Sequence, residues 1–143
     1  GFIDDISGFR HGGEKEKKLV VMIYWVLVFI GGGAGSMFRY FLTQKLNGTG
    51  QGYLNFPFGT LLANILSCFI LGILIQKQLN QQLSEQYRLL LATGFCGGFS
   101  TFSTFGYEIY TYMQKDQLWL GTGYVGLSLL SGLLALIAGM KLL

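Results

Sequence analysis

The chain has 143 residues, of which 51% are hydrophobic and 12% are charged, and its 22 glycines stand against a single proline. This composition excludes an ordinary soluble domain of the same length. Lysines and arginines give a net charge of +3, but they are scattered between apolar stretches, so no basic face can follow the backbone of a nucleic acid.

Residues 1–18 are polar, with acidic and basic side chains interspersed. They contain no apolar core and no small-residue cleavage site of the kind found in signal peptides. We expect this segment to be a flexible polar tail, and we place a membrane domain at residues 19–143.

Four windows without Asp, Glu, Lys or Arg follow this tail, at residues 19–38, 46–76, 89–107 and 118–140. Each holds the roughly 20 apolar residues that cross a bilayer of about 30 Å. The second window exceeds one span, and residues 47–52 are polar and rich in glycine, so we expect its helix to start near Pro57. The prediction is an all-α membrane protein with four transmembrane helices at about 19–45, 57–77, 88–112 and 118–141.

The basic residues bear on how such a chain inserts. With four spans, the two termini and the middle loop share one side of the membrane. Seven basic residues lie toward that side, namely Arg10, Lys15, Lys17, Lys18, Lys77, Arg88 and Lys141, and three lie toward the other, namely Arg39, Lys45 and Lys115. Without the four basic residues of the tail, each side has three. Insertion in both orientations and one fixed orientation with the termini inside both remain open.

Small residues recur one turn apart in three of the predicted helices. The first contains the run Gly31–Ser36, the third contains Gly94 and Gly98, and the fourth contains Ser128 and Gly132. Such spacing lets helix backbones approach closely in a membrane. Four short spans leave little room to enclose a polar pathway within one chain, so we expect a homodimer or a larger assembly.

Polar side chains also mark the first and second helices. Arg39 ends the first, where an arginine either extends to the membrane interface or attracts anions to a vestibule. Thr60, Asn64 and Ser67 form one stripe of the otherwise apolar second helix. An amide in hydrocarbon needs a partner, so Asn64 either bonds a neighbouring helix or faces a hydrated pathway.

The third helix combines glycines, hydroxyls and phenylalanines without charge. We expect it to break near Gly97 and Gly98, which would free carbonyl oxygens suited to a small cation such as Na⁺. Phe99, Phe102 and Phe105 recur every three residues, and the positive edges of aromatic rings attract anions. The alternative is that these rings only fill gaps between helices.

Other candidate residues carry weaker signals. Tyr124 and Ser128, with Ser131 nearby, extend a possible hydroxyl track along the fourth helix. Glu108 closes the third helix, and we expect it to pair with a basic residue. Cys68 and Cys96 match neither a metal site nor a disulfide framework. The single histidine and the lack of a phosphate-binding loop argue against an enzyme.

Three motifs, taken together and in order, resemble the CrcB/Fluc family of fluoride channels. They are Gly-Gly-Gly-Ala-Gly-Ser-Met-Phe-Arg-Tyr at residues 31–40, Phe-Pro-Phe-Gly-Thr-Leu-Leu-Ala-Asn at residues 56–64, and Gly-Phe-Cys-Gly-Gly-Phe-Ser-Thr-Phe-Ser-Thr-Phe at residues 94–105. The third motif is long and unusual enough to be specific. The resemblance covers about residues 25–140.

The resemblance implies an antiparallel, dual-topology homodimer in the cell (inner or plasma) membrane, with two fluoride pores and one structural Na⁺. The family's sodium-binding carbonyls fall on Gly97 and Ser100. Its pore residues and its supporting residues also have counterparts here. The pore set is Asn64, Phe102, Phe105, Tyr124 and Ser128, and the supporting set is Arg39, Thr60, Thr101, Thr104 and Glu108.

One position departs from the family pattern, because the hydroxyl track meets Gly132 where a third hydroxyl is expected, unless Ser131 replaces it. Two other functions stay open. A small proton-coupled multidrug exporter would need a carboxylate deep in a span, and a membrane scaffold would use the polar residues only to join helices.

Overall fold

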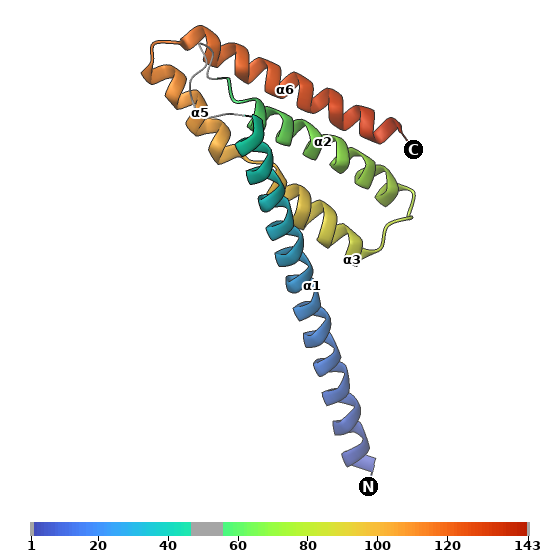
Figure 1. Cartoon of the computed structure of the whole chain (residues 1–143). Coiled ribbons are helices and arrows are strands. Elements are labelled where there is room, and N and C mark those ends of the chain that lie inside the picture. Colours follow the sequence, from blue (N-terminus) through green and yellow to red (C-terminus); the bar gives the residue numbers. More distant parts are fainter. Residues whose placement is uncertain (1, 47–55, 143) are drawn as a thin grey trace.

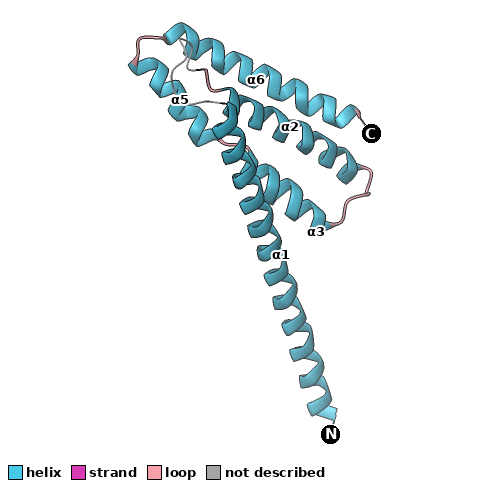
Figure 2. Ribbon diagram, in the orientation of Figure 1, coloured by secondary structure: helices cyan, strands magenta, loops and turns pink. Residues whose placement is uncertain are grey.

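The computed structural model describes residues 2–46 and 56–142, with side chains described from residue 13 onward, and every element in this part of the chain is helical (Figures 1 and 2). Four segments are long and apolar enough to cross a membrane, which confirms the four predicted spans. They are Gly13–Leu46, Phe58–Leu79, Glu85–Gln114 and Leu118–Lys141. The glycine-rich connection expected at 47–52 lies outside the described residues.

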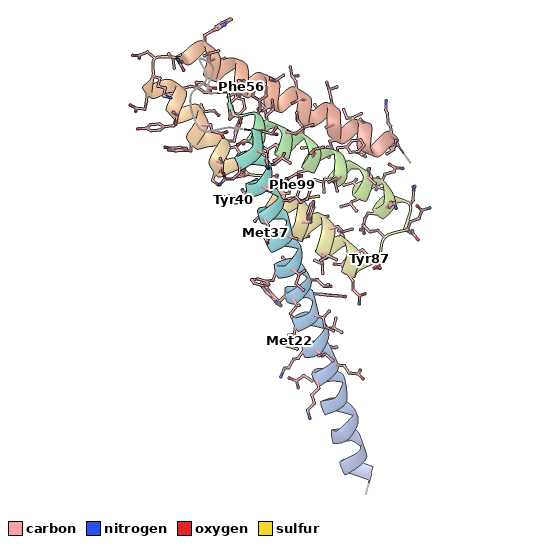
Figure 3. All side chains as sticks on the ribbon, viewed as in Figure 1. Met22, Met37, Tyr40, Phe56, Tyr87 and Phe99 are labelled. Atoms are coloured by element: carbon pink, nitrogen blue, oxygen red, sulfur yellow. The ribbon has the colours of Figure 1, made fainter. Side chains whose placement is uncertain are left out.

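Helix α1 runs from Phe2 to Leu46, so the segment expected to be a flexible tail continues the first helix. Its first half extends beyond the other helices, and Met22 lies on this projecting part (Figures 1 and 3). The only proline of the chain is Pro57, so none interrupts this helix. An exposed ion pair of 2.9 Å between Lys18 and Glu14, four residues apart, adds local support.

The second and fourth spans are single helices, α2 (Phe58–Leu79) and α6 (Leu118–Lys141), which lie side by side in Figure 1. Glycines bring their backbones together. A Cβ atom on Gly72 would clash with the carbonyl of Leu136, and one on Gly139 would clash with the carbonyl of Phe69. Close approach in this pair therefore depends on Gly72 and Gly139, and not on the predicted Ser128 and Gly132.

The third span consists of four consecutive pieces. It begins with α3 (Glu85–Tyr87), capped by Ser84, and continues as the π-helix η1 (Arg88–Cys96) and the short α4 (Gly97–Phe99). Helix α5 (Phe102–Gln114) completes it. Between α4 and α5, Ser100 and Thr101 have extended backbone dihedrals, with ψ of 156° and 120°.

The extended residues do not fall where the sequence analysis expected a break. Gly97 has helical dihedrals and belongs to α4, as does Gly98. Gly98 instead serves packing, because a Cβ there would clash with the carbonyl of Gly32 in α1. Thr101 and its hydroxyl neighbours favour local side-chain bonds over helix, so the chain straightens at these residues and not at the glycines.

Helix α1 packs along η1 and α4 through the predicted glycines. A Cβ on Gly31 would clash with the carbonyl of Leu90, and one on Gly35 would clash with the carbonyl of Phe95. The packing expected between the small residues of the first and third helices is confirmed. This contact holds the interrupted segment against α1, beside the second and fourth spans.

Candidate functional site

Asn64 of α2 lies opposite the extended residues of the third span. Its Oδ1 accepts a hydrogen bond of 2.9 Å from the backbone N–H of Thr101, and its Nδ2 lies 3.5 Å from the carbonyl oxygen of the same residue. A backbone group freed by loss of helix must find another partner in the membrane. The amide of Asn64 supplies one, which is the first of the two alternatives considered for this residue.

Thr101 starts helix α5 as its N-cap. Its Oγ1 accepts a hydrogen bond of 3.2 Å from the N–H of Thr104, and the two hydroxyls lie 3.1 Å apart. Such a cap stabilises the start of a helix by about 1 kcal/mol. Asn64 on one side and the cap on the other therefore hold the interruption in one conformation.

Glu108 joins α2, α5 and α6 through its carboxylate. Its Oε1 accepts from the hydroxyl of Thr60 at 2.6 Å, and its Oε2 accepts from the hydroxyl of Tyr124 at 2.8 Å. The structure gives Glu108 two hydroxyl partners where a basic residue was expected. Thr60 is completely buried and Tyr124 nearly so, and buried hydroxyls need an acceptor, which the carboxylate provides.

A cavity of about 250 Å³ opens beside this carboxylate. It is lined by Arg39, Tyr40, Thr43, Thr60, Thr104 and Glu108. Arg39 reaches it from α1, so the guanidinium and the carboxylate of Glu108 line one cavity.

The three phenylalanines predicted to form one stripe are divided by the extended residues. Phe99 is 1% exposed and packs on Phe38 of α1, with ring centroids 5.8 Å apart; Figure 3 shows it next to this helix. Phe102 and Phe105 lie beyond the interruption, and their ring centroids are 6.2 Å apart. Phe105 is buried against Tyr124, whereas Phe102 is 85% exposed.

The hydroxyls of α6 differ in their partners. Ser128 buries its hydroxyl oxygen, and no hydrogen-bond partner for it is found in the described chain. Ser131 donates to the carbonyl of Leu127 in its own helix at 2.6 Å, so it does not replace the hydroxyl absent at Gly132. Gly132 itself faces Cys68 of α2. Tyr124 and Ser128 are therefore the hydroxyls of α6 that face the other helices.

Gly97 and Ser100 flank the turn of α4 where the sodium-binding carbonyls were expected. Gly97 is exposed, and a Cβ at this position would meet open space. Ser100 directs its N–H and its hydroxyl back to the carbonyl of Cys96, at 3.0 and 2.9 Å. Among the described residues, no group of three or more His, Cys, Asp or Glu side chains could hold a metal ion, so a cation here would rely on backbone oxygens.

A sequence model of one family, described as CrcB-like protein, Camphor Resistance (CrcB), matches residues 26–140. The chain belongs to the CrcB family. Because it belongs to this family and has four helices long and apolar enough to cross a membrane, it is a multi-pass membrane protein. The match begins within α1 and ends at the last turn of α6, so it includes every candidate site residue of this CrcB protein.

Several relatives of this CrcB protein bear the name fluoride-specific ion channel FluC. One from Gloeothece citriformis is 41% identical over 125 residues, which cover 85% of this chain and 97% of the relative. Another from Chlorobium phaeobacteroides is 42% identical over 82% of this chain and 90% of the relative. A third from Pyrococcus horikoshii is 41% identical over 66% of this chain and 74% of the relative.

Two serines contribute contacts that the sequence analysis did not assign to the site. Ser67 of α2 is buried and donates to the carbonyl of Cys96 at 3.0 Å, and Ser36 of α1 lies 3.4 Å from the carbonyl of Gly98. Ser67 shares the helical stripe of Asn64, which was the available signal. Which carbonyls these hydroxyls meet depends on how the third span packs, and spacing along the sequence does not define that.

Proposed function

We propose that this CrcB protein is a fluoride channel that exports F⁻ passively across the cell membrane. The supporting observation is the set of neutral polar groups that the fold gathers between α2, α5 and α6, beside the rings of Phe102 and Phe105. They are the amide of Asn64, the hydroxyl of Ser128, and the hydroxyl of Tyr124, which donates its hydrogen to Glu108. The relatives named as fluoride-specific ion channels point to the same ion.

These groups suit a small, strongly hydrated anion. An amide N–H of Asn64, the hydroxyl hydrogen of Ser128 and ring edges replace water through several weak contacts. Arg39 is the one cation among the described residues that line the cavity, and the carboxylate of Glu108 lines the same cavity. The donor set itself consists of neutral residues, so it holds no fixed positive charge that would trap the ion.

Passive export follows from the acid–base chemistry of the substrate. HF crosses membranes as a neutral weak acid and dissociates in a near-neutral cytoplasm, which leaves F⁻ inside. A negative-inside potential drives each exported anion by about 2.3 kcal/mol per 100 mV. The proposed channel needs no coupled proton or nucleotide.

We further propose that two copies assemble antiparallel, with one pore on each side. Non-helical backbone at membrane depth is tolerated only where protein or water covers it. In a single chain Gly97 is exposed beside the extended residues, and Phe102 is 85% exposed. A second copy over this face would cover both, and inverted insertion is compatible with the near balance of basic residues outside the tail.

A structural Na⁺ between the two copies fits this arrangement. The carbonyl oxygens of Gly97 and Ser100 are neutral, hard ligands, and Gly97 lacks a side chain that would block approach. The ion would supply a positive charge that holds the two interrupted spans together. In the proton-coupled exporter considered above, Glu108 would have to exchange protons with a substrate. Its carboxylate instead accepts from two buried hydroxyls, so the channel is better supported.

Fluoride efflux from proteoliposomes, recorded with a fluoride electrode, tests the proposal. The unmodified protein should release F⁻ without a pH gradient, and Phe102→Ile should abolish release. Phe29→Ile is the matched control, because Phe29 is equally exposed, at 81%, but lies on α1 outside the donor set. Release that requires a proton gradient, or none from the unmodified protein, would overturn the proposed function.

A further inference from the structure

The backbone hydrogen bonds of the third span stop at one identifiable residue. In an uninterrupted helix the N–H of Thr101 donates to the carbonyl of Gly97, four residues earlier. The preceding bond of this pattern, from Ser100 to Cys96, is present at 3.0 Å. The N–H of Thr101 instead donates to Oδ1 of Asn64 at 2.9 Å. Asn64 thus takes the donor that would otherwise cover the carbonyl of Gly97.

Hydroxyl groups donate hydrogen bonds to the carbonyl oxygens of the residues on either side of Gly97. The carbonyl of Cys96 accepts from Ser67 at 3.0 Å and from Ser100, and the carbonyl of Gly98 accepts from Ser36 at 3.4 Å. Three side chains from α1, α2 and the third span itself therefore engage the neighbouring oxygens. None of these three hydroxyls donates to the Gly97 oxygen, whose helical donor is redirected to Asn64.

The amide nitrogen of Asn64 keeps donating capacity. Its distance of 3.5 Å to the Thr101 carbonyl is at the long limit for a hydrogen bond. An amide nitrogen carries two hydrogens, so at least one remains for another acceptor. The oxygen of this side chain is therefore engaged by the Thr101 N–H, whereas the nitrogen can donate to another acceptor.

We propose that Asn64 is a positioning residue for the sodium site, in addition to its role as a donor in the pore. Its oxygen holds the Thr101 N–H away from Gly97, which leaves the Gly97 carbonyl available to Na⁺. Its nitrogen donates to the anion. This inference rests on the proposed channel function and links the two ion sites through one side chain.

Two substitutions separate the tasks. Asn64→Asp keeps an oxygen acceptor for Thr101 but removes the N–H donor, and Asn64→Leu removes both. Unfolding temperatures of the purified full chain in detergent are compared in Na⁺ and in the same concentration of a bulky organic cation. The Na⁺-dependent rise should persist in Asn64→Asp and vanish in Asn64→Leu, while both variants lose fluoride efflux.

Amide hydrogen exchange at Thr101 gives a readout independent of both ions. Exchange should be about tenfold faster in Asn64→Leu, as expected for loss of one hydrogen bond, and unchanged in Asn64→Asp. Phe102→Ile is the control, because it should lose efflux and keep both the Na⁺-dependent rise and the slow exchange. If Asn64→Leu does not fold, Asn64→Asp still decides, since loss of its Na⁺-dependent rise would overturn the inference.

Other outcomes also decide. A Na⁺-dependent rise in Asn64→Leu equal to that of the unmodified protein, or none in the unmodified protein, would overturn the inference. If the rise behaves as expected but the unmodified protein releases no fluoride, the positioning role of Asn64 stands and the proposed channel function fails.

Discussion

The contact between α2 and α6 gives a quantitative test of the packing. Replacing Gly139 with alanine places a Cβ against the carbonyl of Phe69 and 3.1 Å from the backbone nitrogen of Ile73. Both contacts are backbone atoms, so no side chain can rotate away and the two helices must separate. Gly126, on the same helix, has open space around the equivalent Cβ position.

The two substitutions therefore differ only in the steric cost that they add to the free energy of unfolding. Alanine stabilises a helix by about 0.5–1 kcal/mol relative to glycine, and both variants gain this amount. Overpacking a close contact costs about 1–3 kcal/mol, and an unyielding backbone contact belongs at the upper end. Gly139→Ala should lose about 2 kcal/mol overall, whereas Gly126→Ala should be about 0.5–1 kcal/mol more stable.

Thermal unfolding in detergent, followed by circular dichroism, measures the difference. For a chain of this size, 2 kcal/mol corresponds to a Tm about 5–10 °C lower for Gly139→Ala. Equal Tm values for the two variants would refute the close backbone contact between α2 and α6. A lower Tm for Gly126→Ala alone would show that α6 presents a different face to α2.

Two further predictions concern the site. Tyr124→Phe removes the 2.8 Å bond to the half-buried carboxylate of Glu108 and should destabilise the protein by about 1.5–3 kcal/mol in chemical unfolding, because a hydrogen bond to a charged group contributes that much to stability; unchanged stability would show that this bond does not hold α5 and α6 together. Thr101→Val deletes the acceptor for the N–H of Thr104 and should destabilise the protein by about 1 kcal/mol in chemical unfolding, and no loss of stability would contradict the cap.

Much of the fold was predictable because charge and glycine patterns act locally. Long windows without charge located the four spans, since a bilayer admits little else. Small residues in the run Gly31–Ser36 located the contact with the third span, because only they allow backbones this close. The first helix was predicted too short, because charged residues such as Glu14 and Lys18 indicate exposure to water and say little about helicity.

The parts that were not predictable depend on contacts between distant segments. The glycines of the third span suggested a break, yet Gly98 is held in helix against α1, and the extended residues are Ser100 and Thr101. The extended Thr101 bonds Asn64, which is 37 residues away along the chain, and no local pattern indicates that contact. Glu108 was expected to pair with a basic residue, and its carboxylate accepts hydrogen bonds from hydroxyls of two other spans.

The central claim is that fluoride crosses this protein passively, and current across a planar bilayer containing the purified protein tests it most directly. A tenfold gradient of fluoride at equal pH should give a reversal potential of about 59 mV, the value for a monovalent ion moving alone. A reversal potential that follows an imposed proton gradient, or no current in fluoride, would contradict the account.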